Sequence, residues 1–592
     1  MNLSSTIKSI QDIMRKDDGV DGDAQRLGQL TWMLFLKVFD QREAEWEDDN
    51  AAYQSPLPER YRWRNWAAYV PGKDGKKAPQ KTPTEIIGFV NNELFPALKE
   101  QIDASKSAAH KVIKQVFEDS NNYMKSGPQL LAVIEKLEDA IHFDDFKERA
   151  QLGDVYEQLL NDLRGAGNAG EFYTPRAITA FMVDRVNPRL DKRETVMDPA
   201  CGTGGFLTAA INHFRNQITT HSSAADKRAI EQLIHGIEKK QLPHLLCTTN
   251  MLLHGIDNPY QIERRNTLGI PWNEWGADKV NCIVTNPPFG GYEDDGVGSD
   301  YPADLRTRET ADMFMALIVK KLLKENGRAA VVLPDGFLFG DGIKNTLKKL
   351  LLRDCKLHTI VRLPKGVFAP YTTIKTNLLF FTKGATVDDG TEHFHTDTIW
   401  FYEHPYPAGY KSYSKTKPIQ FKEFENIQTW WGNEENGFAE REENERAWKV
   451  DFKTKREQAE AAAAPHWQRA EELNNAAAKL ESEATDLRKS LVGTLDAAHR
   501  EKIDTQIADL RAQAEPLRLQ ARDAQAAGDR LYWPIFNLDQ PNPRAPQEET
   551  HDPDVLLEKY KKLLGEIEET ENQLKSELAA ALAHHFTAEA AE

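Results

Sequence analysis

The sequence predicts a doubly wound, Rossmann-like α/β domain that is joined to an α-helical N-terminal domain, a helical hairpin and a C-terminal helix. Short apolar strands alternate with helical segments through the middle of the chain, and a glycine-rich turn follows the first strand. The two ends of the chain show apolar residues at helical spacing instead. Such alternation is typical of a sheet that binds its ligands at the carboxyl ends of its strands.

Residues 1–150 are predicted to form the α-helical N-terminal domain. Apolar residues recur there at spacings of three and four without the alternation of a strand, as in Leu27, Leu30, Met33, Leu34, Leu36 and Phe39. We therefore expect helices packed on one another in this part of the chain.

Residues 151–450 are predicted to form the α/β catalytic domain. Six short apolar segments separated by helical stretches are the expected strands: Thr195–Met197, Leu233–Ile237, Val280–Val284, Ala329–Leu333, Leu357–Leu363 and Asn377–Thr382.

Residues 451–530 are predicted to form an inserted helical hairpin or short coiled coil. The stretch 466–527 is rich in Ala, Leu, Glu and Arg, and it has leucines seven apart at Leu473, Leu480 and Leu487. Gly493 separates this series from a second apolar series. Pro516 is expected to kink or shorten the second arm, because proline cannot donate the helical hydrogen bond.

Residues 531–592 are predicted to return to the catalytic domain and to end in a helix that docks on a partner. The segment from Asp554 to His584 carries a broad apolar stripe of Leu556, Leu557, Tyr560, Leu563, Leu564, Ile567, Leu574 and Leu578. Because a lone amphipathic helix gains most of its stability from packing, this one needs a partner surface.

Composition narrows the class of protein. The chain has 592 residues, 28% of them charged, and a mean hydropathy of −0.61. It shows neither a membrane span nor the apolar core of a signal peptide, so we expect a cytoplasmic protein. The four cysteines lack the spacing of a zinc or redox pair, so no metal is expected. The formal net charge of −17 disfavours unaided binding of a polyanion; if the substrate is DNA, something else is expected to hold it.

The segment 198–206 has the pattern of a cofactor-binding turn. Asp198 ends a predicted strand and is followed by Gly202, Thr203, Gly204 and Gly205. Glycines let the backbone turn tightly and approach a ligand at the start of the next helix. Because the acid precedes the glycines, the pattern suits the cationic amino group of S-adenosylmethionine better than a phosphate. A glycine turn of no chemical meaning is the alternative.

Two further polar residues follow later predicted strands. Glu238 ends the strand after the glycine turn, at the place where an acid can bind ribose hydroxyls, and the alternative is a surface glutamate. Asn266 follows a third strand and is expected to hydrogen-bond the adenine of the cofactor. Loop polarity explains Asn266 nearly as well.

Residues Asn286, Pro287, Pro288 and Phe289 are the candidate catalytic tetrapeptide. The lone pair of an exocyclic amine is delocalised into its ring, and carbonyls that accept both N–H groups, from Asn286 Oδ1 and the Pro287 backbone, would localise that pair. The prolines stiffen the loop, and Phe289 offers a face on which an extruded base can stack. With the glycine turn, the tetrapeptide predicts methyl transfer to an amino nitrogen.

Together these motifs resemble those of the modification (M) subunit of type I restriction-modification systems, a family of adenine-N6 DNA methyltransferases. The resemblance covers most of the chain, from the helical N-terminal domain through Gly170–Arg176, Asp198–Leu207, Asn250–Gly255, Asn286–Gly290, Gly327–Asp335, Lys375–Phe381 and Asn537–Asp539.

The resemblance implies roles for particular residues. Four are implied to wall the cofactor pocket: Phe172, Tyr173, Thr174 and Pro175. Contacts to S-adenosylmethionine are implied for Asp198, Gly202, Gly204, Glu238 and Asn266, although the family often has Asp in place of Asn266. Asn286, Pro287 and Phe289 are implied to hold a flipped adenine of double-stranded DNA.

The resemblance also implies partners. Family members act as two M subunits on one sequence-specificity (S) subunit, and a restriction and translocase (R) subunit joins for cleavage. Three alternatives stay open at this point. They are methylation of cytosine N4, methylation of a protein glutamine, and a catalytically silent scaffold that keeps the fold only to assemble a complex.

Overall fold

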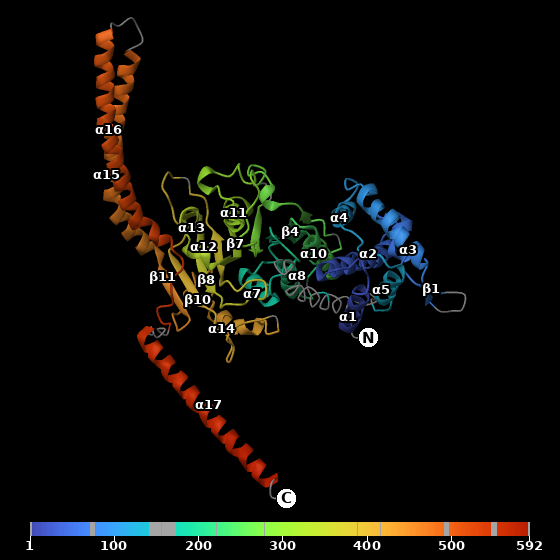
Figure 1. The fold of residues 1–592 in the computed structure, drawn as a ribbon. Helices are drawn as coiled ribbons and strands as arrows, with labels where there is room; N and C mark the ends of the chain where they lie inside the picture. The colour runs from blue at the N-terminus through green and yellow to red at the C-terminus, as the bar shows by residue number, and fades with distance from the viewer. Residues whose placement is uncertain are drawn as a thin grey trace. The chain divides into compact units, whose positions relative to one another are not determined.

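The computed structural model describes residues 3–71, 77–140, 156, 173–220, 222–257, 259–276, 279–387, 389–414, 416–490, 497–545 and 553–589. The chain divides into two units, Met1–Gln540 and Pro541–Glu592 (Figure 1).

The N-terminal part of the first unit is helical, as expected. Its helices are α1 (Leu3–Met14), α2 (Asp23–Asp49), α3 (Pro83–Phe89), α4 (Ala108–Phe117) and α5 (Gly127–Ala140), with a small hairpin of β1 (Val70–Pro71) and β2 (Lys77–Ala78). The apolar residues whose spacing predicted a helix all lie in α2 and are buried. Because the other helices pack around it, α2 forms the centre of this core.

A nine-stranded mixed sheet forms the catalytic part. The spatial order is β11-β10-β8-β9-β7-β6-β3-β4-β5, and only β9 and β11 run antiparallel to their neighbours. The strands are β3 (Val196–Asp198), β4 (Ile234–Glu238), β5 (Ile262–Arg264), β6 (Val280–Thr285), β7 (Leu323–Pro334), β8 (Cys355–Arg362), β9 (Thr376–Lys383), β10 (Thr398–Glu403) and β11 (Ala447–Asp451). All six expected strands are present, as is β5, the strand expected before Asn266; β10 and β11 were not expected.

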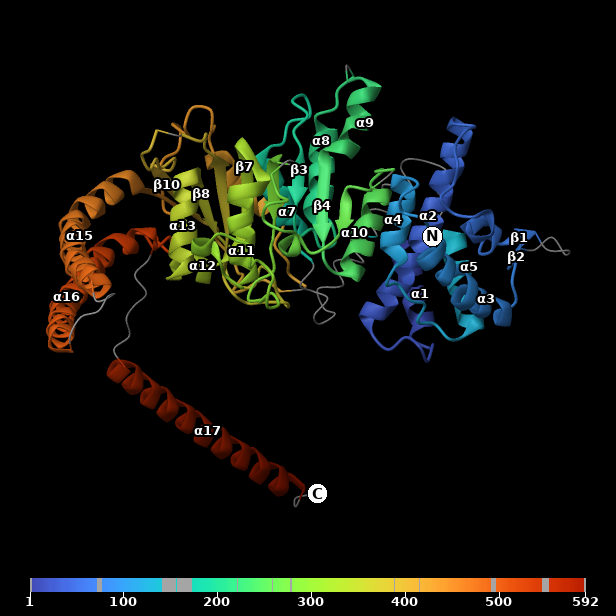
Figure 2. The ribbon, with the colours of Figure 1, turned by 90° about the horizontal axis from the view of Figure 1, so that it is seen from above.

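Helices cover both faces of this sheet, which confirms the doubly wound class (Figure 2). One face packs on α7 (Arg176–Val186) and α8 (Gly205–Asn216), and the other packs on α11 (Thr310–Leu317) and α13 (Ile343–Asp354). Successive residues of β7 alternate between the two faces, as a strand requires. Shorter helices complete the layers: α9 (Ala224–Leu233), α12 (Asp335–Phe339) and α14 (Glu425–Trp430).

Helix α10 (Gln241–Leu253) joins the N-terminal helices to the sheet. Cys247 and Met251 on one side pack into the core of the sheet. Leu245 and Leu252, on another side, pack into the core around α2. Because α10 is buried along nearly its whole length, the two parts share it as a common wall.

The predicted hairpin is present within two residues of its expected bounds but has a different seam. It consists of α15 (Phe452–Ser490) and α16 (Ala497–Tyr532), which run side by side (Figure 1). Small residues seven apart are buried between the two helices: Ala463, Ala470, Ala477 and Ala484 from α15, and Ala514, Ala521 and Gly528 from α16. Of the predicted leucines, Leu473 is buried, whereas Leu480 and Leu487 are half-buried beside the seam. Pro516 lies inside α16, which continues to Tyr532, so this proline does not shorten the second arm.

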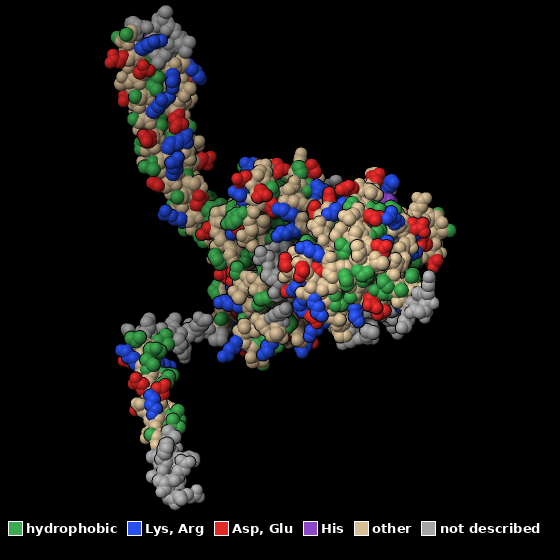
Figure 3. Space-filling view, turned by 45° about the vertical axis from the view of Figure 1, so that its right-hand side comes forward, with side chains coloured by type: hydrophobic (Ala, Val, Ile, Leu, Met, Phe, Trp, Pro, Cys, Tyr) green, Lys and Arg blue, Asp and Glu red, His purple; other side chains and the backbone are tan. Residues whose placement is uncertain are grey.

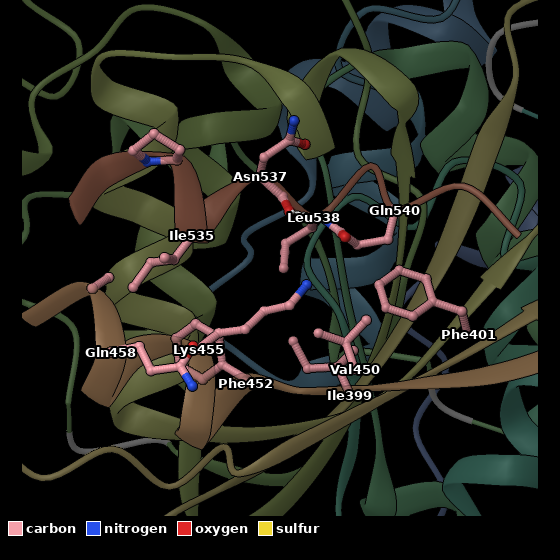
Figure 4. Close-up of a pocket in the computed structure, with 12 residues that line it drawn as sticks. Ile399, Phe401, Val450, Phe452, Lys455, Gln458, Ile535, Asn537, Leu538 and Gln540 are labelled. Carbon is pink, nitrogen blue, oxygen red and sulfur yellow. Dashed lines mark hydrogen bonds between the residues drawn. The ribbon is translucent and has the colours of Figure 1, made fainter. Parts of the chain in front are cut away.

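The chain returns from the hairpin to the sheet through η11 (Trp533–Phe536) and residues 537–540. Asp539 Oδ1 accepts a 2.6 Å hydrogen bond from Arg362, the last residue of β8, and the backbone N–H of Leu538 donates to Leu338 O over 3.0 Å. A groove of about 420 Å³ at the base of the hairpin is lined by Phe401, Phe452, Leu538 and Lys455, among others (Figure 4). A second cavity lies at the carboxyl ends of β3, β4 and β6, and the groove shares no lining residue with it.

The second unit contains α17 (Pro553–Glu589), which agrees with the predicted terminal helix. The eight apolar residues of its predicted stripe are 44% to 69% exposed, and apolar side chains lie along it in Figure 3. Within the described ranges, no helix combines the length and the apolar character that crossing a bilayer requires.

Candidate active site

The site lies where the sheet changes its winding direction. Strands β4 and β5 lie on one side of β3, and β6 lies on the other. In a doubly wound sheet the loops at such a point separate and leave a crevice at the carboxyl ends of the strands. Asp198 ends β3, Glu238 ends β4 and Thr285 ends β6, so three polar side chains meet at this crevice.

A cavity of about 310 Å³, within the range of small-molecule sites, occupies the crevice. It brings together eleven of the residues that the sequence predicted: Thr174, Asp198, Gly202, Thr203, Gly205, Glu238, Asn266, Asn286, Pro287, Pro288 and Phe289. Tyr173, Pro175 and Gly204 are not among its lining residues, and Phe172 lies outside the described residues.

Asp198 is buried at the end of β3. Its Oδ1 accepts hydrogen bonds from Thr285 Oγ1 at 2.7 Å and from the Ala200 backbone at 3.1 Å. Burial, with a smaller contribution from nearby Glu238, raises the pKa of Asp198 to about 7 against the lowering effect of these hydrogen bonds. A buried acid of this kind is stabilised as a carboxylate by a cation.

Glu238 holds the glycine turn in place. Its Oε2 accepts from the Gly202 backbone at 3.0 Å, its Oε1 accepts from the Lys240 backbone at 2.7 Å, and burial raises its pKa. Each oxygen keeps a second lone pair with which it can accept from a hydroxyl. Together Asp198 and Glu238 place two acids with raised pKa values at one cavity.

The glycines of the turn serve different purposes. Gly204 has φ +82° and caps α8, and a Cβ there would lie 2.8 Å from Cys247 Sγ. It therefore packs against α10 rather than lining the cavity. At Gly205 a Cβ would overlap the Arg176 guanidinium, so a side chain there would require that guanidinium to move. Thr203 precedes Gly204, and its buried Oγ1 has no hydrogen-bond partner within the described part of the chain.

Asn266 lies at the far end of the cavity. Its Oδ1 accepts from the Leu268 backbone at 3.2 Å, and its Nδ2 donates to Glu293 Oε2 at 3.1 Å. Glu293 also forms an ion pair with Lys239 at 2.9 Å. The sequence did not single out Lys239 or Glu293, because nothing in their spacing indicates that they meet Asn266.

Three threonine hydroxyls hold the tetrapeptide of residues 286–289. Besides the bond of Thr285 to Asp198, Asn286 Nδ2 donates to Thr174 Oγ1 at 3.1 Å, and Thr310 Oγ1 donates to the Pro288 carbonyl at 2.8 Å. Asn286 Oδ1 is buried and has no partner among the described residues. A residue that lines the cavity therefore carries a buried, unsatisfied acceptor, an arrangement suited to a ligand N–H.

Tyr173 and Pro175 flank the lining residue Thr174 in the sequence but do not line the cavity themselves. Tyr173 is buried in the core around α2, and the Arg176 guanidinium carbon lies 4.8 Å from the centre of its ring. Pro175 precedes α7, whose first residue is Arg176. Tyr371, from the loop after β8, also lines the cavity and was missed, because a lone exposed tyrosine in a loop gives no sequence signal.

The buried groups fit the cofactor that the sequence predicted. S-adenosylmethionine carries a cationic amino group, a carboxylate and ribose hydroxyls. The cavity offers buried acids at Asp198 and Glu238 and an unpartnered hydroxyl at Thr203. Buried polar groups without partners are rare in folded proteins, so these groups point to a polar ligand.

Comparison with known proteins gives a consistent result. Residues 147–475 match the N-6 DNA Methylase family, and residues 3–137 match the HsdM N-terminal domain. The chain is 48% identical over 584 residues to the type I restriction enzyme EcoEI methylase subunit of Escherichia coli, a match that covers 98% of this chain and 99% of that relative.

Two solved structures extend the comparison. A modification subunit ascribed to a type I restriction enzyme of Vibrio vulnificus is 38% identical, with a TM-score of 0.62 over 76% of this chain and 92% of that one. A chain from a type I restriction-modification system, studied for its complex assembly, is 28% identical, with a TM-score of 0.67 over 97% of this chain and 98% of that one. The chain therefore belongs to the N-6 DNA methylase family as a type I modification subunit, an S-adenosylmethionine-dependent adenine-N6 DNA methyltransferase.

Proposed function

We propose that the cavity at the carboxyl ends of β3, β4 and β6 binds the cofactor and the target adenine side by side. Asp198 is assigned to the cationic amino group, Glu238 to the ribose hydroxyls, and Asn266 to the far end, where the adenine of the cofactor would lie. Burial of both acids supports this assignment, because a dry carboxylate attracts a cation or a hydroxyl strongly. When bound, the cofactor supplies an activated methyl group on a sulfonium.

Asn286 and Pro287 are proposed to accept the two N–H groups of the target amine. The observation that carries this role is the buried, unpartnered Oδ1 of Asn286, whose own Nδ2 is held by Thr174. Thr310 Oγ1 donates to the carbonyl of Pro288, so that carbonyl already has a donor. The carbonyl of Pro287 is therefore assigned as the second acceptor for the target amine. Acceptors fixed before the reaction stabilise charge that develops on the amine, because they need not reorganise.

The methyl transfer itself is a direct displacement. The amine lone pair would form the new bond to the methyl carbon, the electrons of the broken carbon–sulfur bond would stay on the sulfur of the leaving thioether, and the methylated amine would release one N–H proton to water. Phe289, half-buried beside the acceptors, is proposed to stack on the adenine, which must leave the duplex to reach the cavity. The carbonyl acceptors and the aromatic face are then the contribution of residues 286–289.

The proposed partners rest on two features, the net charge of the chain and the exposed apolar stripe of α17 in the second unit. A chain of net charge −17 neutralises few phosphates, so we propose that an S-type subunit holds the DNA and that two copies of this chain join it. The exposed apolar stripe of α17 is the proposed docking element. An R-type subunit would join for cleavage, and all of these would act in the cytoplasm, where the host DNA is.

The test is production of the chain with its S-type partner, followed by mass analysis of nucleosides from DNA incubated with the complex and cofactor. N6-methyladenine is expected. N4-methylcytosine would contradict the assigned substrate, and no modified nucleoside would favour a silent scaffold. The Asn286→Ala complex is the matched control, because it should assemble and bind cofactor without producing the modified base.

A further inference from the structure

Thr174 and Asn286 share one hydrogen bond whose direction decides whether the site can work. A threonine hydroxyl both donates and accepts, and the two ends of an amide have the same shape. In the structure Nδ2 of Asn286 donates to Thr174 Oγ1 over 3.1 Å. If the amide were turned over, the Thr174 hydroxyl could donate to Oδ1 equally well.

The two orientations differ at the cavity. In the observed orientation the free group is Oδ1, an acceptor, which suits an N–H of the target amine. In the reversed orientation Nδ2 would face the amine, and two donors would oppose each other. The reversed orientation therefore leaves a buried donor of the enzyme, and one of the substrate, unsatisfied.

The choice depends on the hydrogen of the Thr174 hydroxyl. Among the described residues, Asn286 is the hydrogen-bond partner of this hydroxyl, so its hydrogen has no protein acceptor there while Oγ1 accepts from Nδ2. Thr174 lines the cavity. An anionic acceptor of the cofactor in the cavity would take that hydrogen, and Oγ1 would then be left only as an acceptor.

We propose that Thr174 is a positioning residue that couples cofactor binding to the orientation of the Asn286 amide. The cofactor acceptor engages the hydroxyl hydrogen, Oγ1 can then only accept from Nδ2, and Oδ1 is fixed toward the amine. An occupied cofactor site thus prepares the amine-binding acceptor before DNA arrives. This inference rests on the proposed function of the site.

Three variants separate this role from a simple cofactor contact. Thr174→Val removes the hydroxyl and keeps the shape, whereas Thr174→Ser keeps the hydroxyl. Thr249→Val is the matched control, because it removes a buried hydroxyl of α10 that donates to Leu245 O over 2.8 Å and neither lines the cavity nor bonds Asn286. Thr174→Ala also lacks the hydroxyl and serves in place of the valine variant if that variant does not fold.

Two measurements decide the outcome. Calorimetry with S-adenosylmethionine on the isolated chain should show affinity weakened about tenfold in Thr174→Val, as expected for one lost hydrogen bond, and unchanged in Thr249→Val. Turnover of the assembled complex at saturating cofactor should fall at least about tenfold in Thr174→Val, be largely restored in Thr174→Ser, and stay at the parent level in Thr249→Val.

A second readout does not depend on turnover. With S-adenosylhomocysteine bound, the parent complex should prefer a duplex with adenine at the target position over one with purine, which lacks the amine. Thr174→Val should lose this preference. Full turnover and an intact preference in Thr174→Val would overturn the inference. A parent complex that methylates no adenine would instead contradict the proposed function.

Discussion

Thr285 and Asp198 join the ends of two adjacent parallel strands, with Thr285 Oγ1 donating to Asp198 Oδ1 over 2.7 Å. One residue after Thr285 comes the candidate catalytic Asn286, and Asp198 opens the glycine turn. The acid assigned to the cofactor and the loop assigned to the substrate are therefore held by one buried hydrogen bond. Loss of this hydrogen bond, as in Thr285→Val, should therefore be felt on both sides.

Replacing Asn286 by Ala should lower turnover by at least about a hundredfold while the affinity for S-adenosylmethionine stays nearly unchanged. The reason is that the substitution removes the unpartnered Oδ1 and leaves the glycine turn intact. Single-turnover kinetics and calorimetry measure the two quantities. Activity within a few-fold of the parent would contradict the assigned role.

The affinity for S-adenosylmethionine should depend on pH through Asp198. Its pKa is raised to about 7 by burial, so below that value a proton must leave before the carboxylate can pair with the cationic amino group. Affinity should rise with pH up to about 7 and then level off, with a slope of up to about tenfold per pH unit below it. Calorimetry between pH 5.5 and pH 8.5, taken as roughly one and a half units to each side, measures this. Asp198→Asn should bind more weakly with little pH dependence; an unchanged pH profile would contradict the role.

Gly204→Val should destabilise the chain by at least about 1–3 kcal/mol and abolish cofactor binding. A side chain there would press on Cys247 and Met251 of α10, in a backbone conformation with φ +82° that branched residues avoid. Thermal unfolding and calorimetry measure both effects. Gly88→Ala is the control, because a Cβ at that helical position meets no atom within 4 Å, and it should be neutral or slightly stabilising. Unaltered stability of the Gly204 variant would be inconsistent with this packing.

Gly528→Val should unfold the hairpin locally without changing cofactor affinity. A Cβ at Gly528 would lie 2.6 Å from Trp467 Nε1, which donates to Asp529 over 3.0 Å. No hairpin residue lines the described cavity, so the effects should separate. Limited proteolysis should show new cleavage within 452–532, whereas Gly565→Ala on α17, where a Cβ meets nothing within 4 Å, should not add cleavage there. Resistance equal to the parent would refute the importance of close helix approach.

Disrupting the stripe of α17 should abolish assembly and spare the cofactor site. Leu564→Asp combined with Ile567→Asp should leave a chain that binds S-adenosylmethionine but no longer co-purifies with its S-type partner, and truncation after Pro546 should do the same. Glu558→Ala with Glu569→Ala, away from the stripe, is the matched control and should assemble normally. Site-specific methylation by the isolated parent chain would argue against the need for a partner.

The periodicity of apolar residues predicted the helices and strands that bury a regular stripe of side chains. The other elements form through tertiary contacts that the sequence pattern does not reveal. Helix α2 and strand β6 were evident because each carries several buried apolar residues in order. Strand β11 has only two fully buried residues, Ala447 and Trp448, and it forms through pairing with β10. The hairpin seam was assigned to leucines because alanine also occurs on exposed faces, so its heptad spacing carries little signal on its own.

For the candidate site, the sequence predicted the functional residues at the ends of the strands. It did not predict the residues that form hydrogen bonds to them or to their loops. Asp198, Glu238 and Asn286 each follow a recognisable strand, so their convergence follows from the parallel sheet. Thr310 comes from the start of α11, and Glu293 comes from a loop whose path nothing in the sequence specifies. Residues such as Thr310 and Glu293 can therefore be identified only from a structure that gives the paths of these loops.

The alanine seam of the hairpin has a mechanical consequence. Helix α15 begins at Phe452, immediately after β11 ends at Asp451, so no flexible loop separates the sheet edge from the hairpin. Its 39 residues span about 58 Å at the rise of an α-helix, and small interlocked side chains resist sliding of one arm past the other. Because no loop intervenes at Phe452, a movement of the first arm relative to the sheet has to be taken up by β11 and its pairing with β10.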